Sequence, residues 1–167
     1  ALRFGSSPAE IGVAAGDRVD ILYRLSLNRY NGRTSGQVTV SEILPSEDVL
    51  AVRAAELERY SGIISGKTVP DDSEMPSRAD FAAFYRCVKS VGTEETSFSF
   101  IGRACGIGSY IKLRLISGIL GEAGLITVSE TPDGFPGFET LRITVNETEG
   151  KVNLEETCLY RTLKNSR

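Results

Sequence analysis

The chain has 167 residues, 41% of them hydrophobic and 25% charged, which is enough to bury the core of one ordinary domain or two small ones. Its net charge of −3 lacks the basic excess of a dedicated duplex-binding domain, so any nucleic-acid contact must be local or shared with segments outside the chain. The absence of histidine excludes Ser-His-Asp and Cys-His nucleophilic centres and histidine metal sites. No apolar run approaches the roughly 18 residues of a membrane span. Three widely spaced cysteines favour reduced thiols and a cytoplasmic location.

Residues 18–43 alternate in the way that is typical of a β-hairpin. Over 18–27, one face carries Val19, Ile21, Tyr23, Leu25 and Leu27. A period of two over this length predicts a strand with one face buried. Residues 28–33 (NRYNGR) are predicted to form the turn, since Asn-Gly adopts positive φ angles at low cost. A second alternating run at 35–43 predicts the returning strand.

A helix and then a linker are predicted after the hairpin. Ser46 is the expected N-cap, and two acidic residues follow it in the first turn. Apolar residues then recur with a period of 3.6 as far as Ile64. Residues 66–76 form the linker, where we place a domain boundary. Within it, residues 71–74 (DDSE) are a carboxylate-only candidate for magnesium, but a solvated linker is the simpler interpretation, and we assign no metal site.

Residues 77–163 predict an order of elements that is typical of a winged-helix unit. Ser77 and Asp80 form a capping box at its start. The predicted elements are helices at 77–92, 98–105 and 109–122, strands at 125–129 and 139–145, and a last helix at 152–163. Lys112 and Arg114 are about 200° apart around their helix. That helix is therefore predicted to be a core helix without a basic face for duplex recognition.

The remaining motifs, a glycine-rich turn and an aromatic residue in the second hairpin, are assigned structural roles. Gly102 and the turn at 106–108 contain a G-x-G, but no strand precedes it, and Ile111 stands where the dinucleotide fingerprint has its third glycine. We interpret these glycines as a turn between helices. Phe135, at the tip of the second hairpin, is expected to pack on the last helix.

The first hairpin holds the best candidates for nucleic-acid contact: Arg24, Asn28, Arg29, Tyr30, Asn31 and Arg33. Aromatic rings stack on unpaired bases and guanidinium groups pair with phosphates. Five arginines oppose four acidic residues over 1–45, so the positive field is local. Tyr23 shares the apolar face and is assigned to the core. A solvated turn is the alternative interpretation of residues 29–33.

Several segments resemble a known family. Residues 4–5 (FG), 16–23 (GDRVDILY), 28–32 (NRYNG) and 37–43 (QVTVSEI) form an ordered series similar to the distal half of the OB-fold domain of RecJ exonucleases. Residues 80–86 (DFAAFYR) and 150–157 (GKVNLEET), with Tyr160, resemble the appended C-terminal domain of Firmicute-type members.

The resemblance implies a 5′→3′ exonuclease that acts on single-stranded DNA in recombination and repair. Its Mn²⁺ or Mg²⁺ ions belong to a histidine-containing domain that this chain does not include, so no catalytic residue, metal ligand or cofactor is assigned here. The OB-fold role of guiding single-stranded DNA transfers to the hairpin candidates. The first two OB strands are expected upstream of Ala1, and the open barrel edges favour pairing with a second copy.

The predicted fold is therefore α+β, with a partial OB-type β domain at 1–45, a connector helix and linker at 46–75, and a winged-helix-like domain at 76–167. The predicted function is to guide single-stranded DNA or to dock a partner such as single-strand-binding protein, away from membranes. Two alternatives stay open: a stand-alone winged-helix regulator of duplex DNA, and a structural protein-interaction module.

Overall fold

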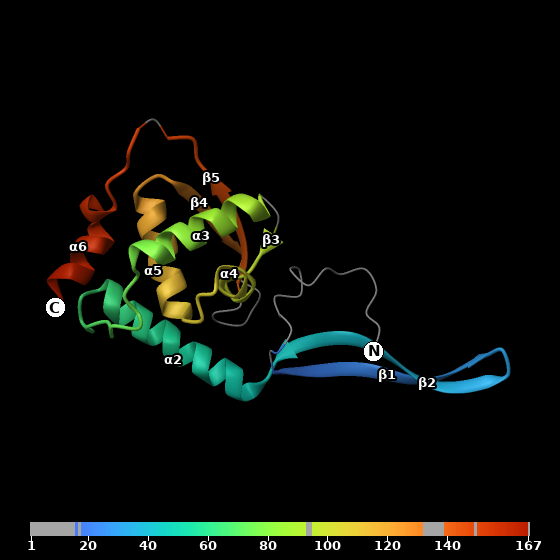
Figure 1. Ribbon diagram of the computed structural model, residues 1–167. Coiled ribbons are helices and arrows are strands. Elements are labelled where there is room, and N and C mark those ends of the chain that lie inside the picture. The colour runs from blue at the N-terminus through green and yellow to red at the C-terminus, as the bar shows by residue number, and fades with distance from the viewer. Residues whose placement is uncertain (1–15, 17, 93–94, 132–138, 149, 167) are drawn as a thin grey trace.

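The computed structural model describes residues 16, 18–92, 95–131, 139–148 and 150–166. These residues form a mixed α/β structure with a two-stranded and a three-stranded antiparallel sheet (Figure 1). A long hairpin extends away from a compact group of helices, and one helix, α2, joins the two (Figure 1). The motif at Phe4-Gly5 and the expected contact of Phe135 lie outside the described residues.

The extended hairpin consists of β1 (Val19–Tyr30) and β2 (Arg33–Pro45). Its two-residue turn is Asn31-Gly32, with φ angles of 47° and 74°. Positive φ at both positions matches the twist of an antiparallel pair, which confirms the turn at Asn-Gly. The turn is shorter than the predicted 28–33, because residues 28–30 continue β1 and Arg33 begins β2. The register runs from Tyr30 opposite Arg33 to Val19 opposite Pro45, with one irregularity beside Tyr23.

The prediction that one face of the strand at 18–27 is buried is wrong, although Val40, opposite Tyr23 on the returning strand, is buried. Leu25 and Leu27 are 71% and 72% exposed. A two-stranded sheet buries a face only when another layer covers it. The alternation of apolar and polar residues therefore predicted an amphipathic strand correctly. It could not predict whether another part of the structure covers the apolar face.

The connecting helix α2 (Glu47–Ile64) joins the core at its C-terminal end. It packs against α5 (Tyr110–Glu122) and α6 (Cys158–Asn165). Ile63 has no exposed surface, whereas Ile64, which the periodicity assigned to the buried face, is 43% exposed. The predicted apolar face is therefore wrong at Ile64, whereas Leu57, which was assigned to the same face, does pack against the core.

The rest of the chain follows the predicted order closely. Its other elements are α3 (Arg78–Val91), β3 (Glu95–Thr96), α4 (Phe98–Cys105), β4 (Ile126–Thr131), β5 (Thr140–Val145) and the 3₁₀ turn η1 (Leu154–Glu156). The sheet order is β3-β5-β4. The capping box of Ser77 and Asp80 is confirmed.

The predicted last helix at 152–163 is interrupted. Thr157 has an extended backbone, with φ −66° and ψ 147°, and it separates η1 from α6. Its hydroxyl accepts a hydrogen bond from the backbone N–H of Tyr160, so it caps the new helix. Side-chain capping by threonine favours a fresh helix start over continuation of the preceding turn.

Residues 66–76 contain neither helix nor strand, as the linker prediction requires, but they are not simply solvated. Glu74 is only 7% exposed. Its carboxylate accepts hydrogen bonds from Arg59 Nε at 2.5 Å and Arg59 Nη2 at 2.8 Å, and from the backbone N–H of Asp71 at 2.7 Å. The hydrogen bonds from Arg59 lower the pKa of Glu74. The linker is therefore tied to α2 by an ion pair, and the placement of a domain boundary here stays a prediction.

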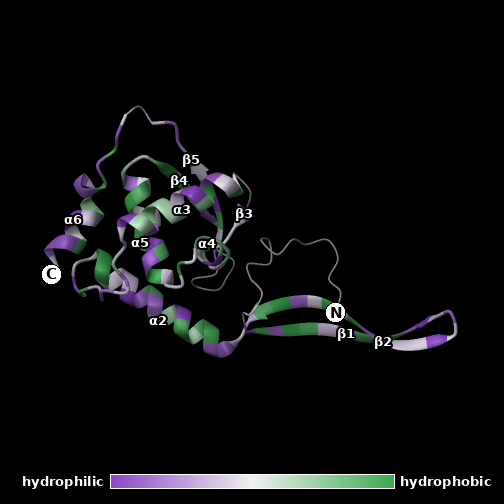
Figure 2. Ribbon diagram, viewed as in Figure 1, coloured by the Kyte–Doolittle hydropathy of each residue, from purple (hydrophilic) through white to green (hydrophobic). Residues whose placement is uncertain are grey.

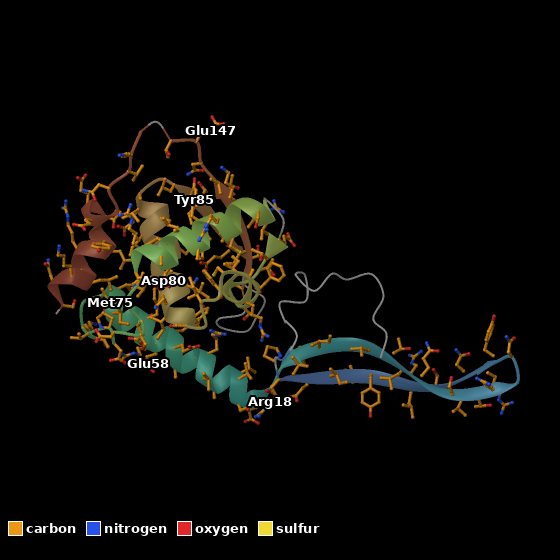
Figure 3. The ribbon with its side chains drawn as sticks, viewed as in Figure 1. Arg18, Glu58, Met75, Asp80, Tyr85 and Glu147 are labelled. Carbon is orange, nitrogen blue, oxygen red and sulfur yellow. The ribbon has the colours of Figure 1, made fainter. Side chains whose placement is uncertain are left out.

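Replacing Glu74 with glutamine should destabilise the protein by about 1–2 kcal/mol, because Arg59 keeps its charge and loses a charged partner. The folded-state pKa of Glu74 is lowered, so its contribution is complete above the unfolded-state value of about 4.3 and is lost as pH falls through the folded value. Urea unfolding should show a constant difference between wild type and Glu74→Gln above about pH 5 that shrinks in more acidic buffer. The exposed Glu58, on the same helix, supplies the control Glu58→Gln (Figure 3). Equal losses for the two variants would contradict the prediction.

Candidate nucleic-acid interface

The hairpin register brings the predicted contact residues together at its distal end. Tyr30 lies directly opposite Arg33, and Asn28 lies opposite Ser35. Because side chains alternate between the faces of a strand, Arg24, Asn28, Tyr30 and Arg33 share one face. Arg29 lies on the other face. Asn31 occupies the turn itself. The six predicted residues therefore surround the tip and do not form a single flat patch.

The tip is exposed and positively charged. Tyr30 is 74% exposed. Residues 23–40 contain three arginines and no acidic residue, although the chain as a whole carries a net charge of −3. Among the described residues, Arg24, Arg29 and Arg33 form no ion pair. Their guanidinium groups are thus available to an anionic ligand, and an exposed tyrosine ring lies among them.

The opposite face of the hairpin is apolar, and Tyr23 belongs to it. Cross-strand pairs place Ile21 with Ile43, Tyr23 with Val40 and Leu25 with Val38. Hydrophobic colouring covers much of the half of the hairpin nearer α2 and gives way to hydrophilic colouring toward the turn (Figure 2). The assignment of Tyr23 to a core is wrong, since its side chain is 53% exposed. The hairpin thus offers a second exposed aromatic ring.

The base of the hairpin is held to α2 by a small polar cluster. Arg18 donates to the Asp48 carboxylate, and Figure 3 places Arg18 where the hairpin meets the helix. The Ser46 hydroxyl donates to Asp48 Oδ1 at 2.5 Å and to the backbone oxygen of Arg18 at 3.4 Å. The hydrogen bond from Ser46 lowers the pKa of Asp48, and the hydrogen bond and positive charge of Arg18 lower it further.

Ser46 therefore occupies the predicted N-cap position but makes no side-chain cap. Its hydroxyl instead joins the hairpin to the helix. Sequence reasoning missed this cluster because Arg18 and Asp48 are far apart along the chain, and no local pattern links them.

The basic residues of α5 are engaged inside the protein. Lys112 Nζ lies 3.4 Å from Asp80. Arg114 Nη1 lies 2.5 Å from Glu130, and Nη2 lies 3.9 Å from Glu139. Eight residues of α5 are buried. The prediction of a core helix with little outward basic surface is therefore confirmed.

Aromatic rings surround Arg114 and complete this internal cluster. Its guanidinium carbon lies 5.3 Å from the ring centroid of Phe98, 5.4 Å from that of Tyr60 and 5.7 Å from that of Tyr110. Burial raises the pKa of Tyr110, so its hydroxyl stays neutral and donates to Glu139 at 3.4 Å. The arrangement stabilises the contact of α5 with α2 and β4.

The glycines between α4 and α5 have a structural role. Gly106 ends α4 in the left-handed conformation, with φ 75°. A Cβ atom on Gly102 would lie 2.6 Å from the backbone oxygen of Ile107 and 2.8 Å from Leu113 Cδ1. These glycines allow two helices to approach closely, as expected for a turn between helices.

Comparison with known proteins returned no matching family model, no matching curated protein and no matching solved structure. Within the described residues, no helix combines the length and apolar character that a membrane crossing requires. The same residues contain no group of three or more histidine, cysteine, aspartate or glutamate side chains placed to hold a metal ion.

Alanine at Gly102 and alanine at Gly121 should have opposite effects on stability. At Gly102 the added Cβ meets backbone, so Gly102→Ala should destabilise by about 1–3 kcal/mol. Gly121, within α5, has nothing within 4 Å of the added atom, and Gly121→Ala should stabilise by about 0.5–1 kcal/mol through helix propensity. Urea unfolding of both variants measures the difference. A Gly102→Ala variant as stable as wild type would contradict the close approach of the two helices.

Proposed function

We propose that the extended hairpin binds single-stranded DNA, and that the chain is the DNA-guiding part of a RecJ-type exonuclease. The observation that carries the proposal is the hairpin tip: three arginines without acidic neighbours, beside an exposed Tyr30, on an arm that stands clear of the helices (Figure 1). Guanidinium groups neutralise phosphates, and tyrosine rings stack on bases that are not paired.

Single-stranded nucleic acid fits this surface better than duplex DNA. A helix-based duplex reader needs several polar or basic side chains on one outward face. In α5, Lys112 and Arg114 are paired with Asp80 and Glu130 instead. The arginines of the hairpin point to both of its faces, which suits a flexible strand that winds around the tip more than a rigid double helix.

The proposal also assigns a fold family to each of the two parts of the chain. The hairpin is the distal portion of an OB-type barrel, whose other strands would cover the exposed apolar face around Leu25. The helical portion is a winged-helix-like unit. Its support is the order α3, β3, α4, α5, β4, β5 and the sheet order β3-β5-β4, in which the returning strand lies at the centre.

Catalysis in this proposal belongs to a separate domain of a cytoplasmic parent enzyme, which would hold Mn²⁺ or Mg²⁺. This chain would hold the strand on its way to that domain and dock a partner such as single-strand-binding protein. A structural interaction module is the second candidate function, and the exposed apolar face of the hairpin favours it, since such faces mark interaction surfaces. DNA binding distinguishes the two.

Reversing the tip charge should abolish most of the affinity for single-stranded DNA. The double variant Arg29→Glu/Arg33→Glu replaces two phosphate contacts by repulsion. We expect a loss of at least about tenfold in the binding of oligo-dT, and a salt dependence shallower by about 1.4 in the slope of log K against log salt. Fluorescence anisotropy with labelled oligo-dT measures both.

The control is Arg161→Glu on α6, which changes an exposed arginine in the helical group away from the hairpin and makes half of the charge change of the tip variant (Figure 1). It makes the same change at a single site and should leave binding unchanged within about twofold. Equal losses in the control and the tip variant would indicate a general charge effect. Absence of oligo-dT binding by the wild type would favour the interaction module.

A further inference from the structure

The register of the hairpin separates its outer half into two chemically different faces. Side chains alternate between the faces of a strand, so residues that lie two apart share a face. On one face of the outer half, β1 carries Arg24, Ser26, Asn28 and Tyr30. Opposite the last three of these, β2 carries Gln37, Ser35 and Arg33. These seven residues, here called the polar face, include no acidic and no aliphatic side chain.

The other face of the same segment is apolar except at its outer end. It carries Leu25 and Leu27 on β1, and Leu25 pairs with Val38. Among the residues of β1 and β2, Arg29 is the one basic residue on this face. In the proposed function the other strands of the barrel cover this apolar surface. Only the polar face is then left for a nucleic acid along the length of the hairpin.

Positive charge lies at both ends of the polar face. Arg33 lies opposite Tyr30 at the turn, and Arg24 lies three same-face steps nearer to α2, about 20 Å along the strand. Both arginines are exposed, and neither forms an ion pair within the part of the chain that the structure describes. Nearer still to α2 the sign changes, because Asp20 and Glu42 lie on the same face there. A polyanion is therefore attracted to the segment between Tyr30 and Arg24 and repelled from the base of the hairpin.

Hydroxyl and amide groups occupy the polar face between the two arginines. Ser26, Asn28 and Ser35 are exposed, and Gln37 is half-buried. Serine, asparagine and glutamine side chains are among those that proteins use to contact phosphate and sugar oxygens. The exposed ring of Tyr30 suits stacking on an unpaired base of any sequence. The polar face thus combines phosphate contacts along its length with one stacking position at the turn.

We infer that the single strand lies lengthwise along the polar face, from Tyr30 at the turn to Arg24, and that Ser26 and Ser35 are further contact residues. The inference rests on the proposed function and adds a path to it. Arg29 contacts the strand where it passes around the turn. A path of about 20 Å accommodates about six nucleotides at about 3.4 Å each, and fewer where the bases are unstacked. This length is within the site sizes of single-strand-binding barrels, which are about 4–16 nucleotides.

Adjacent residues of β1 supply a matched pair of variants for the test. Ser26→Glu and Leu27→Glu each add one negative charge at an exposed position, but the two side chains project from opposite faces. At an ionic strength of about 0.15 M, screening over about 8 Å limits the effect of each charge to its own face. Fluorescence anisotropy with labelled oligo-dT of about 10 nucleotides measures the affinity, and thermal unfolding by circular dichroism checks the fold. Ser35→Glu, on the polar face of β2, tests the same path if Ser26→Glu does not fold.

Ser26→Glu and Ser35→Glu should each weaken the binding of oligo-dT about three- to tenfold, because a carboxylate then lies beside the phosphates. Leu27→Glu should change the affinity by at most about twofold. Arg24→Gln should reduce the slope of log K against log salt by about 0.7, because one phosphate contact is lost.

Two results would overturn the inference: serine variants that fold normally and bind as wild type does, or a Leu27→Glu variant that is at least as defective as they are. In either case a tip variant, Arg29→Glu/Arg33→Glu, that still loses affinity would leave the proposed function standing without this path. Absence of oligo-dT binding by the wild type would overturn both.

Discussion

Burial of α5 on every side determines the positions of the other elements. Ile111, Ile116 and Ser117 are all buried, and at about 100° per residue their side chains point to three different sides of the helix. A helix that is apolar all round is stable in water only when neighbours cover each side. Here α2, α3, α4, α6 and β4 all pack against it. The internal pairing of Lys112 and Arg114 follows from the same constraint, because a charge at the edge of this core needs a partner.

The hairpin depends on this core indirectly. One end of α2 is fixed by Ile63 in the core, and the other end meets the hairpin base at Arg18, Ser46 and Asp48. Of the hairpin residues that the structure describes, Val40 alone is buried, and the two ends of the hairpin differ in character. Its apolar half, around Leu25, is exposed, whereas its tip carries the arginines that contact the strand in the proposed function. The apolar surface and the basic surface do not overlap on the hairpin, because they lie at different distances from α2.

Features that depend on neighbours in the chain could be predicted from the sequence. The turn at Asn31-Gly32, the capping box at Ser77 and the limits of α5 all follow from local backbone preferences. The six tip residues were also identified by composition, although their distribution over two faces depends on strand register. The exposure of Tyr23 and the burial of Glu74 could not be predicted, because each depends on neighbours in space that are distant in the chain. Within the described part of the chain no second layer covers Tyr23, whereas Arg59 pairs with Glu74.

The irregularity in the register of the hairpin has a mechanical consequence. Leu22 pairs with Glu42 and Tyr23 with Val40, so Ser41 is an additional residue on one strand only. Such a bulge increases the local right-handed coiling of a two-stranded ribbon. The outer segment is therefore rotated about the long axis relative to the segment next to α2. A flexible polymer lying along the arm would follow a helical path around it, so its contacts near the turn and near the helices would face different directions.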